Sequence, residues 1–114
     1  MRLINQTQST ILATNVSMAN NPLKRIKGLL GKKNFLRGEA LIIKPCNSVH
    51  TFFMHFSIDL LFVNKDYKII KVLPAFAPNK ISGIYWKSSL VIELPCGTIN
   101  LTKTQNKDQL QLEK

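Results

Sequence analysis

The sequence predicts a mainly β domain of the α+β class, arranged as a small, mostly antiparallel β-barrel or sandwich with one or two short helices. Two neighbouring runs, residues 49–56 and 58–63, are largely apolar on both faces, as central strands of a barrel or sandwich are. Residues 64–66 read Asn-Lys-Asp, which favours a turn, and a further apolar run follows at 67–73, so we expect an antiparallel hairpin. With 114 residues, 45% of them apolar, the chain can form one core, and we predict a single domain over residues 1–114.

The N-terminal part of the chain predicts a strand pair and a helix. Residues 2–16 have the threonine and isoleucine content of a hairpin, with a polar turn around residues 6–9. Asn21 is a suitable N-cap and Pro22 a suitable first helical residue. The apolar positions that follow share one helical stripe, and Gly31 ends this short amphipathic helix: Leu23, Ile26, Leu29 and Leu30.

The remaining elements follow from short apolar runs and the residues that interrupt them. Residues 40–44 predict a buried strand that Pro45 ends, and the prolines, Asn79 and Gly83 of residues 74–83 predict an irregular loop. We expect another strand at residues 90–94. A short helix from about Thr98 and a final strand at 109–112 complete the predicted fold.

Basic residues outnumber acidic residues by a wide margin. Sixteen Lys and Arg against six Asp and Glu give a net charge of +10, which attracts phosphate backbones, anionic lipid or acidic proteins. The excess is concentrated between residues 24 and 44, where Glu39 is the only acid. We expect a basic patch formed by Lys24, Arg25, Lys27, Lys32, Lys33 and Arg37. A solvated face is the favoured interpretation, because no RNA-binding signature accompanies the patch.

The start of the chain holds no sign of a targeting segment. Its first twenty residues contain only short apolar groups, far short of a signal peptide or a membrane span. We therefore expect a cytoplasmic protein without a membrane span.

Two carboxylates stand inside apolar runs and are the best indication of a site. Burying Asp59 or Glu93 is costly unless a partner pairs with the group or it is protonated, so each needs a partner. In a strand, Asp59 shares a face with Leu61 and Val63, where it either bonds loop amides or lines a site. Glu93 either pairs with a base or takes part in chemistry. If both carboxylates lie in one cleft, general acid–base chemistry becomes feasible.

Four segments agree with one known family in order, spacing and identity. They are residues 25–32 (RIKGLLGK), 38–54 (GEALIIKPCNSVHTFFM), 58–63 (IDLLFV) and 91–97 (VIELPCG), within residues 24–112. These segments resemble the family called domain of unknown function 192, also named uncharacterised protein family 0127, in its His-Thr-Phe-Phe-Met subgroup. The resemblance implies a compact, mostly antiparallel β domain of no settled activity.

The same resemblance marks individual positions. The residues that match Met54, Asp59 and Glu93 are motif positions in the family, and His50 belongs to the subgroup motif. Many relatives read Gly-Asp before the last strand, whereas this chain reads Asn-Lys-Asp at residues 106–108.

Three classes of function stay open. The favoured class is a binding module whose pocket takes a small polar ligand or a peptide end, and its candidate residues are His50, Thr51, Met54, Asp59 and Glu93, with Phe52, Tyr85 and Trp86 nearby. The second is an enzyme that uses Asp59 and Glu93 with His50. The third is an adaptor that binds nucleic acid or an acidic protein through the basic patch. We predict no metal or cofactor, because His50 and Met54 share a strand face from which His55 points away.

Overall fold

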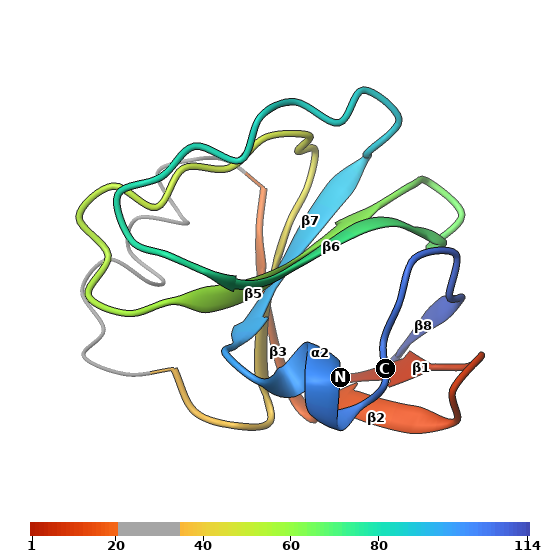
Figure 1. The fold of residues 1–114 in the computed structure, drawn as a ribbon. Helices are drawn as coiled ribbons and strands as arrows, with labels where there is room; N and C mark the ends of the chain where they lie inside the picture. Colours follow the sequence, from red (N-terminus) through yellow and green to blue (C-terminus); the bar gives the residue numbers. More distant parts are fainter. Residues whose placement is uncertain (21–34) are drawn as a thin grey trace.

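The structure is a computed structural model that describes residues 1–20 and 35–114. Its smaller sheet is formed by Arg2–Asn5 (β1), Thr10–Ala13 (β2) and Leu110–Glu113 (β8), in the order β2-β1-β8. The larger sheet is formed by Asn15–Ala19 (β3), Glu39–Ile43 (β4), Ile58–Val63 (β5), Ile69–Phe76 (β6) and Leu90–Pro95 (β7), in the order β3-β4-β7-β5-β6. One short helix, Thr98–Leu101 (α2), follows β7. Figure 1 shows the arrangement, which confirms the mainly β class in its sandwich form.

Most strand pairs are antiparallel, and β3 with β4 is the parallel exception among the described strands. The predicted N-terminal hairpin is confirmed, because β1 and β2 pair antiparallel around a turn at residues 6–9. The strands predicted at 40–44, 90–94 and 109–112 correspond to β4, β7 and β8, and the helix predicted from Thr98 corresponds to α2. The helix predicted from Pro22 lies outside the described residues.

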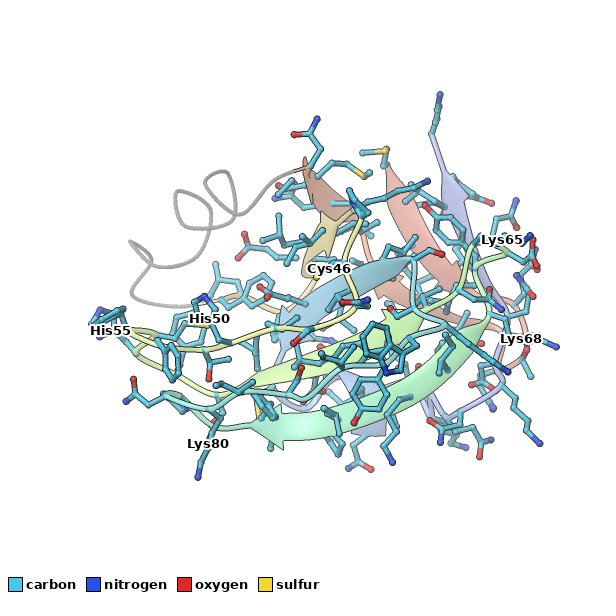
Figure 2. The ribbon with its side chains drawn as sticks, turned by 90° about the horizontal axis from the view of Figure 1, so that it is seen from above. Cys46, His50, His55, Lys65, Lys68 and Lys80 are labelled. Atoms are coloured by element: carbon cyan, nitrogen blue, oxygen red, sulfur yellow. The ribbon has the colours of Figure 1, made fainter. Side chains whose placement is uncertain are left out.

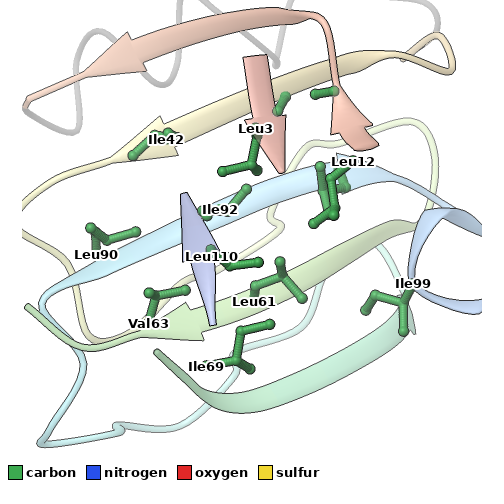
Figure 3. Packing of buried hydrophobic residues seen from close by; sticks show 13 residues of the cluster. Leu3, Leu12, Ile42, Leu61, Val63, Ile69, Leu90, Ile92, Ile99 and Leu110 are labelled. Atoms are coloured by element: carbon green, nitrogen blue, oxygen red, sulfur yellow. The ribbon is translucent and has the colours of Figure 1, made fainter. Parts of the chain in front are cut away.

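Two apolar clusters lie on the two faces of the larger sheet. The inter-sheet cluster fills the space toward the smaller sheet and includes Leu3, Leu12, Ile42, Leu61, Ile92, Ile99 and Leu110 (Figure 3). The loop-side cluster covers the other face and includes Leu41, Ile43, Val49, Met54, Leu60, Phe62 and Val91. Every residue of β5 and β7 is therefore buried, which explains why both strands are apolar on both faces.

The hairpin of β5 and β6 is confirmed, although β6 starts at Ile69 and continues through Pro74. The loop predicted at 74–83 was therefore wrong for residues 74–76. Pro74 is tolerated because β6 is the outermost strand of the larger sheet and pairs with β5 alone. The next residue, Ala75, has a left-handed φ of 50°, and the pairing shifts in register between Ile58 and Leu60.

The strand predicted at residues 49–56 was wrong. This segment belongs to a loop of residues 44–57, which runs beside a second loop of residues 77–89, and we call the two the paired loops. Figure 1 shows both loops on the side of the larger sheet that faces away from the smaller sheet. Val49 and Met54 of this segment are apolar because their side chains pack into the loop-side cluster. It cannot be a continuous strand, because Phe53 turns the chain at a φ of 67°.

Lys107 has a left-handed φ of 76° in the turn before β8, so it adopts the conformation that glycine favours. Its neighbour Asp108 is buried and accepts hydrogen bonds from Asn5 Nδ2 at 2.9 Å and from the Gln105 backbone N–H at 3.0 Å. Lys107 therefore occupies a position at which glycine would carry no backbone strain.

Replacing Lys107 with glycine is expected to raise the free energy of unfolding by about 0.5–1 kcal/mol. Relief of the left-handed conformation contributes roughly 1–2 kcal/mol, and the entropy of glycine in the unfolded chain offsets about half of it. Urea unfolding of Lys107→Gly and of Lys65→Gly, whose residue has no positive φ, makes the comparison. Lys65→Gly should lower the stability, and a similar loss in Lys107→Gly would contradict this account.

Candidate functional site

Asp59 lies on β5 with its side chain toward the inter-sheet cluster, since it alternates with Leu61 and Val63. The side chain is almost fully buried, and three backbone N–H groups bind it. Asp59 Oδ1 accepts a hydrogen bond from Ala75 at 2.9 Å, and Oδ2 accepts two more, from Gly97 at 3.1 Å and Ile99 at 2.8 Å. The carboxylate therefore joins the kinked end of β6 to the first turn of α2.

This arrangement replaces a conventional helix cap. Gly97 is the N-cap of α2 and has no side chain that could accept a hydrogen bond from the first helical turn. Asp59 supplies the acceptor from a neighbouring strand instead. The three amides account for the burial of this carboxylate without any ligand.

Glu93 lies on the central strand β7 and points to the other face of the larger sheet. It is paired with Leu41 of β4 and Leu60 of β5, and both of these residues belong to the loop-side cluster. In the same register Asp59 is opposite Leu94, a member of the inter-sheet cluster. Glu93 is fully buried beneath the paired loops. The two carboxylates therefore do not share a cleft, and joint acid–base chemistry on one ligand is not available to them.

The other candidate residues all come from the first of the paired loops. His50 is exposed, and its ring stacks on Phe52 with 5.0 Å between the centroids. Met54 is buried in the loop-side cluster. Figure 2 shows His50 and His55 at one end of the molecule, whereas Lys65 and Lys68 lie at the opposite end. Four of the five candidate pocket residues therefore lie on the face of the larger sheet that the paired loops cover: His50, Thr51, Met54 and Glu93. Asp59 lies on the other face.

Thr51 holds the paired loops together. It is fully buried, and its hydroxyl donates to the Ala77 carbonyl at 2.6 Å and accepts from the Lys80 N–H at 3.0 Å. Its own N–H donates to the Lys80 carbonyl at 2.9 Å, and its carbonyl accepts from Asn79 at 2.9 Å. Asn79 in turn accepts the Phe53 N–H on its side-chain oxygen at 3.2 Å.

The contacts between the loops continue away from Thr51. The Ser82 N–H donates to the Val49 carbonyl and the Tyr85 N–H donates to the Asn47 carbonyl, each at 2.9 Å. Tyr85 packs on the core residue Phe62, with 4.3 Å between the ring centroids. The paired loops are therefore a bonded layer that rests on the larger sheet.

Large apolar side chains extend from this layer into solvent. We call this group the apolar outer face, and its exposed fractions are Phe53 80%, Trp86 80%, Ile81 66%, Ile84 52% and Phe52 38%. The backbone bridge between His50 and Ile81 joins the two loops within it. Sequence reasoning missed Phe53, Ile81 and Ile84. For Phe53 the reason is that a strand at 49–56 would have buried its apolar residues. Adjacent phenylalanines gave no signal that the chain turns between them.

The paired loops carry positive charge only. Residues 44–57 and 77–89 contain Lys44, Lys80 and Lys87 but no Asp or Glu. Of the six residues of the predicted basic patch, Arg37 lies in the described part of the chain, where it is exposed. The other five lie outside it.

A shallow depression of about 280 Å³ is lined by residues of both loops, namely Pro45, Cys46, Asn47 and Ser88. Its lining includes none of the five candidate pocket residues.

Comparison with known proteins assigns the family. The sequence model of DUF192, described as "Uncharacterized ACR", matches residues 3–112. The chain belongs to the DUF192 family. This DUF192 chain is 27% identical over 116 residues to the UPF0127 protein of Thermococcus sibiricus, an alignment that covers 97% of this chain and 74% of the relative.

Two solved structures share the fold of this DUF192 chain. One is titled a putative transcription regulator from Sinorhizobium meliloti, with a TM-score of 0.77, 20% identity, and coverage of 96% of this chain and 89% of that one. The other is a protein of unknown function from Novosphingobium aromaticivorans, with a TM-score of 0.83, 14% identity, and coverage of 98% and 84%. At these identities the likeness shows the fold alone.

Two further properties concern the described part of this DUF192 chain. Among residues 1–20 and 35–114, no three His, Cys, Asp or Glu side chains are grouped so that they could hold a metal ion. In the same part of the chain, no helix has the length and apolar character needed to cross a bilayer.

Proposed function

We propose that this DUF192 protein is a binding module that takes an anionic partner on the apolar outer face. The observation that carries the proposal is that five large apolar side chains extend from two bonded loops that contain lysines and no acid. Groups of large exposed apolar side chains mark interaction sites, whereas single exposed ones are ordinary on protein surfaces. The lysines favour a negatively charged partner.

The buried carboxylates support binding over catalysis. Asp59 is engaged by three amides, and Glu93 points to the opposite face of the larger sheet. In this proposal His50 contacts the partner, Thr51 orders the loops, and Met54 and Glu93 lie beneath them. Asp59 has no part in binding.

The conformation of Phe53 is a second support. A bulky residue at a φ of 67° is strained by roughly 1–2 kcal/mol, and an exposed side chain regains little of that by packing. Strain of this kind persists where the surrounding structure imposes it. Here the side-chain oxygen of Asn79 accepts a hydrogen bond from the Phe53 N–H and so helps to hold the strained conformation. The strain is therefore consistent with a side chain held out for a partner.

Trp86 provides the test, because it is the only tryptophan of the chain and lies on the apolar outer face. We expect its fluorescence to respond to at least one of three anionic probes at low salt: polyglutamate, oligothymidine or phosphatidylglycerol vesicles. Added salt should weaken the response, because exposed charges are screened within about 10 Å at 0.1 M.

A matched pair of variants locates the contact. Ile81→Ser should weaken binding about fivefold, and Leu101→Ser on α2 should leave it unchanged, since the two side chains are 66% and 68% exposed. The proposal would be refuted if Trp86 fluorescence did not change with any of the three probes, or if both variants lost the same amount of binding affinity.

A further inference from the structure

We infer that the anionic partner is the surface of a lipid bilayer, into which the apolar outer face inserts from the aqueous side. The inference rests on the proposed function and names its partner. It starts from the mixture of side chains on that face, which combines the aliphatic Ile81 and Ile84 with the aromatic Phe52, Phe53 and Trp86. The boundary between lipid headgroups and acyl chains accepts both kinds of side chain.

Other anionic partners suit this mixture less well. Single-stranded nucleic acid binds by stacking its bases on aromatic rings along a basic groove, and isoleucine offers no ring for stacking. A peptide needs a groove or a free sheet edge, and the residues of the apolar outer face belong to loops, outside the strands of the larger sheet. The depression that the two loops form is lined by Pro45, Cys46, Asn47 and Ser88, none of which is aromatic. The exposed side chains extend outward from the loops, which suits insertion into a soft surface.

The positions of the lysines match the positions of the most exposed aromatic residues. Lys87 directly follows Trp86, and Lys80 directly follows Asn79, the residue that binds the Phe53 N–H. Trp86 therefore has a lysine as its neighbour in the chain, and Phe53 is bonded to a residue that has one. Anionic headgroups attract lysines near the bilayer surface, whereas the absence of Asp and Glu from both loops removes repulsion.

The orientation of the molecule agrees with docking through this side. The paired loops lie on the side of the larger sheet away from the smaller sheet, so insertion of their exposed residues leaves β1, β2 and β8 in water (Figure 1). The loops also have a bonded framework, through Thr51 and the contacts from Val49 to Ser82 and from Asn47 to Tyr85. The apolar residues are therefore presented without a folding step at the membrane.

Vesicles provide the direct test with the full chain. Binding is measured by co-sedimentation with vesicles of phosphatidylcholine alone and of equal parts phosphatidylcholine and phosphatidylglycerol. We expect binding to the mixed vesicles, a shift of Trp86 emission to shorter wavelength, and quenching by lipids brominated on their acyl chains. Neutral vesicles should bind at least tenfold more weakly, because each lysine near the surface contributes about fivefold.

Two variants separate insertion from general attraction. Phe53→Gly should lower vesicle binding about tenfold while leaving the protein at least as stable in urea, since glycine accepts a φ of 67° without strain. Lys80→Gln should lower binding about fivefold. Lys68→Gln is its control, because Figure 2 places Lys68 at the opposite end of the molecule from Lys80.

The outcomes distinguish this inference from the proposal beneath it. If Trp86 responds to oligothymidine or polyglutamate and not to mixed vesicles, the lipid partner is wrong and the anionic-binding proposal stands. If no probe elicits a response, both are wrong. Two results would overturn insertion: equal losses of vesicle binding in Lys80→Gln and Lys68→Gln, or vesicle binding without quenching by brominated lipid. Either result would mean that the net charge of +10 alone attracts the protein to the vesicles.

Discussion

Replacing Asp59 with alanine is expected to lower the free energy of unfolding by about 3–4 kcal/mol. Each hydrogen bond to a charged group contributes roughly 1.5–3 kcal/mol, and three end on this carboxylate, from Ala75, Gly97 and Ile99. Their sum is larger than the expected loss because Ala75 and Gly97 lie near enough to the surface to bond water in the variant, whereas Ile99 is buried. Urea unfolding measures the change.

Asp59→Asn tests the same role with a side chain of nearly the same shape. Backbone N–H donors approach both oxygens of Asp59. The amide of asparagine has only one accepting oxygen, so its NH₂ group would face at least one of these N–H donors and could not accept its hydrogen bond. We expect a loss of about 1–3 kcal/mol. The folded variant should still bind mixed vesicles, because Asp59 and the paired loops lie on opposite faces of the larger sheet. If the alanine variant lost under about 1 kcal/mol, the capping role of Asp59 would be wrong.

Replacing Thr51 with valine is expected to cost about 2–3 kcal/mol, although the two side chains have nearly the same shape. The change removes the hydroxyl that bonds Ala77 and Lys80, and a buried polar group left without its partner costs about 1–3 kcal/mol. Thr51→Ser keeps the hydroxyl and should cost about 1 kcal/mol or less, for the lost methyl group.

The loss in Thr51→Val should also be local. Amide hydrogen exchange is expected to accelerate at Asn79 and Lys80, whose N–H groups end on Thr51, before it changes in β5 or β7. Vesicle binding should weaken together with this loop order, since Asn79 positions Phe53. Unchanged exchange at Asn79 and Lys80 would show that other contacts hold the paired loops.

Most strands could be predicted because their signals are local. The run at 58–63, the turn at 64–66 and the apolar run after it lie next to one another in the chain, and the hairpin of β5 and β6 has that order. The segment at 49–56 has equally apolar residues but forms a loop. Its burial comes from contacts across the loop-side cluster and with residues about 30 positions later, and the composition of the segment cannot reveal such contacts.

The candidate site divides in the same way. The sequence by itself determined that Asp59 and Glu93 are buried, that His50 and Met54 lie close together in the chain, and that the family is DUF192. Only the tertiary structure decided which face each carboxylate takes. Alternation along a strand relates Asp59 to Leu61, but the register between β5 and β7 pairs Leu60, not Asp59, with Glu93. A shift of one residue in the pairing of β5 with β7 would place Asp59 and Glu93 on the same face of the sheet. This register is set by contacts between distant parts of the chain, and no local sequence pattern encodes it.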